Sequence, residues 1–184
     1  EPKTALEKLI KQKALANVDA DKQARHFELL TESMKEAGYE HYEISNFAKP
    51  GFRSRHNSSY WQGAPYLGLG PSAHSFNGIS RQWNVSNNAL YIQSLLKGLV
   101  PFEVETLSGE QRYNEYIMTS LRTIEGLSLQ KVEKDFGKDK YEYLLKTAIP
   151  HLNRNHLSME NEFLKTTAKG RFLADGIASD LFYL

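Results

Sequence analysis

The run Gly38-Tyr39-Glu40-His41-Tyr42-Glu43-Ile44-Ser45-Asn46-Phe47-Ala48-Lys49-Pro50-Gly51 contains a helix end, a strand and a turn in close succession. Gly38 suits a helix end because a residue without Cβ enters the left-handed conformation easily. Residues 40–45 have the character of a strand, and Pro50-Gly51 is a strong turn signal. A helix followed at once by a short strand predicts an αβ unit of a parallel sheet.

The rest of the first hundred residues predicts further helices and strands. Residues 46–64 are polar and aromatic, and we expect an irregular loop there. A loop of this length is usually functional or disordered, and its tyrosine, tryptophan and arginines argue against disorder. The other predicted elements are a helix over 4–16, a helix from Asp19 or Asp21 to Gly38, strand-like runs at 66–69 and 73–77, and a helix from Ser86 to Leu96.

The second half of the chain predicts a mostly helical domain. Ser108 and Gln111 form a capping box, which is typical of a helix start. The expected order is a helix from Ser108 to Gly126, a short helix from Ser128 to Gly137, a helix over 139–152, a hairpin with arms at 157–159 and 163–165, and a last helix from Thr166 or Thr167 to Phe182. This order is winged-helix-like, and it places a domain boundary between residues 1–100 and 101–184.

The composition excludes several classes of site. The chain has 184 residues, a net charge of +1 and no cysteine. It therefore cannot form disulfides, zinc–thiolate sites or iron–sulfur ligation with its own residues. Its apolar runs are too short to span a bilayer, and no secretory signal opens it, so we expect a cytoplasmic protein. The start Glu1-Pro2-Lys3 has no initiator methionine and suggests a fragment.

The richest candidate site is His56-Asn57-Ser58-Ser59-Tyr60-Trp61, preceded by Arg53 and Arg55. An imidazole, two large aromatic rings and two guanidinium groups together suit a flat, apolar, anionic cofactor. No Asp or Glu occurs between Glu43 and Glu103, so the local field is positive although the whole chain is nearly neutral.

Plainer readings stay open for each of these residues. His56 can instead bond a loop carbonyl, with Trp61 filling the core beneath the loop. His74, among small residues, is more typical of a core or supporting histidine than of a ligand. A basic face for nucleic acid is a further alternative, but acidic residues interrupt its lysines, Lys131, Lys134, Lys138 and Lys140, which favours a solvated surface.

The residues also resemble a known family. The runs 42–51, Ser54-Arg55-His56-Asn57, Tyr60-Trp61 and 66–75 are similar to the oxygen-independent coproporphyrinogen III oxidase family of radical SAM proteins (HemN/HemW), and most similar to its heme chaperone branch. The H-N-x-x-Y-W motif is read in that branch as a heme-binding element. The run 167–173 resembles the helical C-terminal domain of the family.

The resemblance implies a fold, an activity and cofactors. The fold would be α/β plus α: the C-terminal part of a partial (β/α)6 barrel, followed by a helical, winged-helix-like domain. The [4Fe–4S] cluster and S-adenosylmethionine would bind upstream of this chain, which should have no catalytic residues and be inactive alone. The implied activity is that of a heme chaperone that delivers heme to acceptor proteins; the alternatives are radical decarboxylation of coproporphyrinogen III and, in another class, a winged-helix nucleic-acid binder.

The resemblance also implies roles for individual residues. His56 would contact heme iron, Asn57 would orient the loop, and Tyr60 and Trp61 would frame the ring. Arg53 or Arg55 would bind the heme propionates. Three further residues would support the site from behind or face the barrel lumen: Glu43, Ser45 and His74. The whole protein could form a homodimer or lie peripherally at a membrane, and nucleic acid is not an expected partner.

Overall fold

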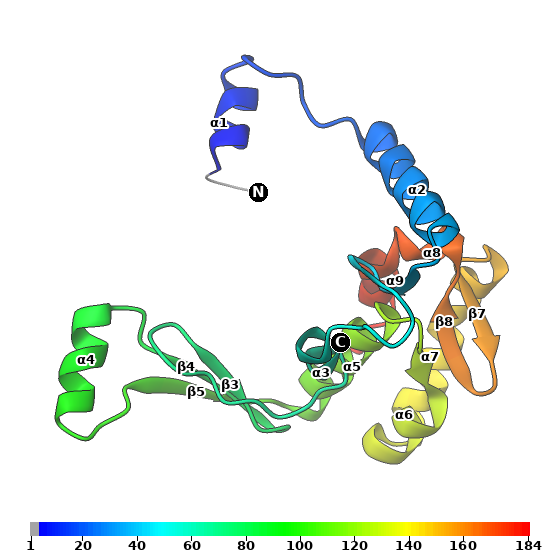
Figure 1. Ribbon diagram of the computed structural model, residues 1–184. Coiled ribbons are helices and arrows are strands. Elements are labelled where there is room, and N and C mark those ends of the chain that lie inside the picture. Colours follow the sequence, from blue (N-terminus) through cyan, green and yellow to red (C-terminus); the bar gives the residue numbers. More distant parts are fainter. Residues whose placement is uncertain (1–3) are drawn as a thin grey trace.

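A computed structural model describes residues 4–184 and combines helices with small antiparallel sheets (Figure 1). The helices are α1 (Ala5–Lys11), α2 (Ala20–Glu36), α3 (Arg55–Trp61), α4 (Asn88–Leu96), α5 (Gly109–Leu121), α6 (Leu129–Phe136), α7 (Lys138–Asn153), α8 (Ala168–Arg171) and α9 (Ala174–Asp180). The strands are β1 (Glu40–Glu43), β2 (Asn46–Ala48), β3 (His74–Phe76), β4 (Ser80–Asn84), β5 (Phe102–Thr106), β6 (Leu127–Ser128), β7 (Leu157–Glu160) and β8 (Phe163–Thr166).

The helix–strand unit at residues 19–48 has the predicted elements but a different pairing. The Asp19 side chain caps α2, and Gly38 after it has a φ of +75°. β1, however, pairs antiparallel with β2, with Glu40 opposite Ala48. The expected parallel pairing is therefore wrong for this strand. Only two residues separate β1 from β2, and a connection that short can join only antiparallel neighbours.

The strands β3, β4 and β5 form an antiparallel sheet that extends away from the helical domain, with α4 at its far end (Figure 1). The predicted turn at Asn77-Gly78 is confirmed: the Asn77 side chain accepts hydrogen bonds from two backbone N–H groups, and Gly78 has a φ of +97°. Two details differ from expectation. Residues 66–69 contribute only a single bridge, Tyr66 to Phe76, and Asn87 rather than Ser86 caps α4.

The main core lies in the C-terminal domain, where α5, α6 and α7 pack with a three-stranded sheet in the order β6-β8-β7. The predicted capping box of Ser108 and Gln111 is confirmed, and so is the hairpin of β7 and β8. The fully buried side chains include Tyr113, Ile117, Leu121, Leu127, Val132, Leu144 and Leu164.

The predicted last helix is divided into α8 and α9. Thr167 caps α8, and Leu173 lies at the N-cap position of α9. A Cβ on Gly170 would lie 1.9 Å from the carbonyl oxygen of His156. This close backbone approach holds α8 against the start of β7, and the chain has to turn before α9 can reach α5.

His41 joins the first half of the chain to the C-terminal domain. Its Nε2 donates to the carbonyl of Ile44 at 2.9 Å, and its Nδ1 accepts from Nη1 of Arg171 at 2.9 Å. The ring also stacks on Phe47. Burial is the main cause that lowers the pKa of His41, and the neighbouring Arg171 charge acts in the same direction.

Over residues 4–184, no helix has the length and apolar character needed to cross a membrane.

Candidate functional site

The H-N-x-x-Y-W motif forms a helix, α3, and not the irregular loop that the sequence predicts. Ser54 is the reason: its side chain accepts a hydrogen bond from the backbone N–H of Asn57 at 3.2 Å, which satisfies a donor at the helix start. On a helix, residues four apart lie on one face. His56 therefore lies beside Tyr60, and the motif presents two different faces.

The outer face of α3 carries His56 and Tyr60. The two rings meet edge to face with centroids 5.0 Å apart, and Tyr60 meets Tyr66 in the same way at 4.8 Å. His56 is exposed, and none of the described residues forms a hydrogen bond with its imidazole ring. Its ring nitrogens are thus available to a ligand. Arg55, next to it, is also exposed and has no carboxylate partner within residues 4–184.

The inner face of α3 is tied to a buried carboxylate. Asn57 donates from Nδ2 to the side-chain oxygen of Asn46 at 3.4 Å, and Asn46 in turn donates to Glu43. Glu43 is only 2% exposed. Its Oε1 accepts from Nε and Nη2 of Arg122, each at 3.0 Å, and its Oε2 accepts from the backbone N–H of Ser45. This Glu43–Arg122 network, together with Asn46 and Asn57, fixes which face of α3 points outward.

Arg53 is already occupied by two carboxylates. Its Nε and Nη2 form a two-pronged contact with Glu40, each at 2.8 Å, and its Nη1 donates to Glu125. The hydrogen bond with Glu40 is the largest of the effects that raise the pKa of Arg53. A heme propionate could reach this guanidinium only by displacing a carboxylate. Of the two predicted arginines, Arg55 is the one free to meet an acid group.

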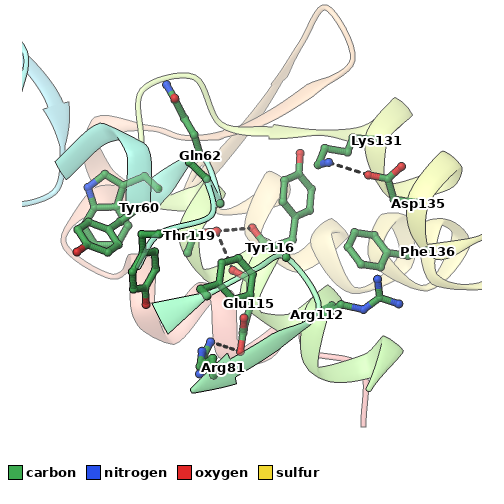
Figure 2. Close-up of a pocket in the computed structure, with 16 residues that line it drawn as sticks. Tyr60, Gln62, Arg81, Arg112, Glu115, Tyr116, Thr119, Lys131, Asp135 and Phe136 are labelled. Atoms are coloured by element: carbon green, nitrogen blue, oxygen red, sulfur yellow. Dashed lines mark hydrogen bonds and ion pairs between the residues drawn. The ribbon is translucent and has the colours of Figure 1, made fainter. Parts of the chain in front are cut away.

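Trp61 is half-buried and separates two cavities. Its ring lies under the guanidinium of Arg122, 5.1 Å from the ring centroid to Cζ, and its indole N–H is buried without an acceptor among the described residues. A smaller cavity of about 220 Å³ lies between Trp61 and Tyr42. A larger one of about 560 Å³ lies between α3, the β3–β4 hairpin and helices α5 and α6 (Figure 2).

The larger cavity, which we call the aromatic cavity, is lined by six aromatic side chains and several charged ones. The aromatic residues are Tyr60, Trp61, Tyr66, Phe76, Tyr116 and Phe136. Two of its cations are paired, Arg81 with Glu115 and Lys131 with Asp135 (Figure 2). Arg112 also lines it, is exposed, and has no carboxylate partner within residues 4–184.

Sequence reasoning missed the C-terminal side of this cavity. It assigned Lys131 to a solvated surface, and no local pattern marks Arg112 or Tyr116 as lining residues. It also missed Arg122, because the pair with Glu43 joins positions 79 residues apart. Contacts of this kind have no periodicity that a sequence could show.

The remaining predicted site residues lie elsewhere. His74 is exposed on β3, faces Trp83 with ring centroids 6.2 Å apart, and lines a separate open hollow. Ser45 is exposed and contacts Glu43 through its backbone. Within residues 4–184, no group of three His, Asp or Glu side chains could hold a metal, and the chain has no cysteine. The described residues therefore do not fit an iron–sulfur cluster, which needs several thiolate or imidazole ligands. Heme iron, in contrast, requires only one axial side chain from the protein.

Comparisons with known proteins agree with this architecture. Residues 107–173 match the family described as HemN C-terminal domain. The chain is 31% identical over 179 residues to "Heme chaperone HemW" of Mycobacterium tuberculosis H37Rv, covering 97% of the chain and 44% of the relative. It is 31% identical over 139 residues to the HemW of Bacillus subtilis, covering 75% of the chain and 37% of the relative. The chain thus spans less than half the length of these curated relatives.

A solved structure of HemN from Escherichia coli has the same fold over most of the chain. That protein is described as a coproporphyrinogen III oxidase and a radical SAM enzyme, and it matches with a TM-score of 0.69 at 18% identity. The match covers 90% of this chain and 42% of that one. At 18% identity this likeness shows only the fold: the chain shares the mixed α/β fold of the matching part of HemN.

Proposed function

We propose that the chain is the part of a radical SAM family heme chaperone, similar to HemW, that holds heme through His56 and passes it to acceptor proteins. The single observation that carries this proposal is the exposed His56 imidazole, free of hydrogen bonds to the described residues, on a helix whose opposite face is anchored. A neutral imidazole is a good axial ligand for heme iron.

The neighbours of His56 support the same role. Tyr60 stands edge to face against the imidazole at 5.0 Å and would limit its rotation. Arg55 precedes it and would fork onto a propionate. Asn57 faces the Glu43–Arg122 network and would keep the imidazole pointed outward. Heme bound on an exposed helix face stays accessible to an acceptor, as delivery requires.

The names of the relatives also favour a chaperone. Each HemW that we compared is described as a heme chaperone, whereas the match to the oxidase HemN rests on fold at low identity. In the whole protein, the residues up to 100 would complete a radical SAM barrel. β5 pairs with β4 in the sheet of the first part, and the residues after it, 107–184, would form a winged-helix-like domain, which the order α5, β6, α6, α7, β7, β8 supports.

Heme titration of a His56→Ala variant tests the proposal. We expect binding at least about tenfold weaker than wild type and an altered Soret band, because the iron loses its axial ligand. His26→Ala is a matched control, since His26 is an exposed histidine on a helix outside the site. Equal affinity and an identical Soret band in the wild type and His56→Ala would refute the role of His56.

A product assay separates the chaperone from the oxidase. The whole protein, with its cluster assembled, is incubated with coproporphyrinogen III and, separately, with heme and an apo-acceptor. Stoichiometric heme capture and transfer support the chaperone. Turnover to protoporphyrinogen IX without heme capture would replace the chaperone with the oxidase.

A further inference from the structure

The aromatic cavity is a separate feature from the proposed heme ligand, because His56 does not line it. Its volume of about 560 Å³ lies within the usual range for small-molecule sites. We propose that this cavity receives the acid-bearing edge of a tetrapyrrole, with Arg112 as the partner of its carboxylate. That the ligand is a tetrapyrrole, and not another flat carboxylic acid, rests on the proposed function. The presence of the cavity and of its unpaired Arg112 is independent of that function.

The charges of the cavity favour an anionic group at one position. Of its three cations, Arg81 is paired with Glu115, and Lys131 is paired with Asp135 at 2.7 Å. Arg112 lines the same cavity without a carboxylate partner within residues 4–184. A planar guanidinium binds a carboxylate through two parallel hydrogen bonds. A bound acid group would therefore find one free cation and would not need to break an ion pair.

The walls of the cavity favour a flat ring. Tyr116 and Phe136 lie on the side of α5 and α6, with ring centroids 5.9 Å apart and ring planes inclined by 29°. Trp61 lies on the α3 side, and its buried indole N–H lacks an acceptor among the described residues. Buried donors are nearly always paired in native proteins, and an oxygen of a bound ligand could supply the missing acceptor.

Tyr60 connects the cavity to the proposed heme ligand. It lines the cavity and also meets His56 edge to face at 5.0 Å. A tetrapyrrole that contacts His56 would thus lie beside one wall of the cavity. The C-terminal domain, through α5 and α6, would take part in binding together with the motif on α3.

Iron-free protoporphyrin IX is the probe for this site, since it has no metal for His56 to bind. Its fluorescence is titrated with the purified wild-type protein, with Arg112→Gln and with Arg154→Gln. Arg154 is also an exposed arginine, but it lines none of the cavities described above. We expect Arg112→Gln to weaken binding about tenfold, the loss typical of a charge-assisted hydrogen bond, and Arg154→Gln to change it less than about twofold. The dimethyl ester of protoporphyrin should bind wild type and Arg112→Gln equally.

A cavity-filling variant, Thr119→Phe, tests the site without removing a charge. Thr119 lines the cavity, and its hydroxyl bonds only to carbonyls of its own helix, so its loss leaves no buried partner unpaired. We expect binding of protoporphyrin IX to be at least about tenfold weaker. Unchanged affinity in both Arg112→Gln and Thr119→Phe would overturn the cavity proposal even if His56→Ala abolished heme binding. Conversely, porphyrin binding that depends on Arg112 would support the cavity even if His56 proved dispensable for heme.

Discussion

Replacing Arg122 with Met should lower the free energy of unfolding by about 3 kcal/mol, because it leaves the Glu43 carboxylate buried without its cation. Glu43 is 2% exposed, and both contacting nitrogens of Arg122 lie 3.0 Å from its Oε1. Removing one partner of a buried pair typically costs about 3–5 kcal/mol. The Arg122 side chain is 20% exposed, which places it at the lower end of that range. Its second contact, with the exposed Asp175, adds little.

Urea denaturation measures this change directly, and a thermal scan should show a midpoint lower by roughly 6–12 °C for a chain of this size. Arg154→Met is the control and should stay within about 0.5 kcal/mol of wild type, as exposed substitutions usually do. A second substitution, Glu43→Gln, removes the stranded charge. Its amide oxygen can still accept from the Ser45 backbone and from Asn46.

The double variant Arg122→Met/Glu43→Gln should therefore be more stable than Arg122→Met alone by about 1 kcal/mol or more. Two results would refute the reasoning. One is a loss below about 0.5 kcal/mol for Arg122→Met. The other is a loss from Glu43→Gln that simply adds to that of Arg122→Met, which would mean that the two side chains do not depend on each other.

Two further predictions concern pH and glycine positions. Burial, together with the nearby Arg171 charge, lowers the pKa of His41, so the stabilisation from neutral His41 is complete above the unfolded pKa of about 6.5 and falls as the pH drops toward the folded pKa. The decrease in thermal midpoint between about pH 7.5 and 5.5 should therefore be smaller in His41→Gln than in wild type, and an equal decrease would contradict this. Gly170→Ala should destabilise the protein by at least about 1 kcal/mol, since its Cβ would meet the His156 carbonyl at 1.9 Å, whereas Gly176→Ala, with open space around it on α9, should stabilise it by up to about 1 kcal/mol in the same denaturation assay.

Local signals in the sequence predicted the local elements well. The capping box at Ser108 and the turn at Asn77-Gly78 lie where the sequence places them, and the structure selects Asp19 from the two predicted caps, Asp19 and Asp21; each of these features depends on hydrogen bonds within a few residues. The pairing of β1 was predicted wrongly, since a helix before a strand says nothing of which neighbour the strand finds. The helix of the motif was missed because its polar residues have no apolar periodicity, although Ser54 is a recognisable cap.

The site was predictable only in part, and the reason is its construction from distant segments. The sequence singled out His56, Tyr60 and Trp61 because unusual residue types stand close together. It did not single out Arg112 or Tyr116, whose neighbours on α5 are typical of any amphipathic helix. The positive field expected around the motif is also weaker than predicted, because Arg53 is paired with carboxylates from outside the acid-free stretch, Glu40 and Glu125.

The two faces of α3 explain why the motif contains both ligand-type and anchor-type residues. His56 and Tyr60 point outward and carry the proposed chemistry, whereas Asn57 and Trp61 contact the Glu43–Arg122 network on the other side. Arg122 follows α5 and lies within the HemN C-terminal domain match, so a residue of that domain sets the orientation of a helix far earlier in the chain. A substitution at Arg122 would therefore affect stability and the proposed heme binding together, since the same guanidinium neutralises the buried carboxylate and supports the ring of Trp61.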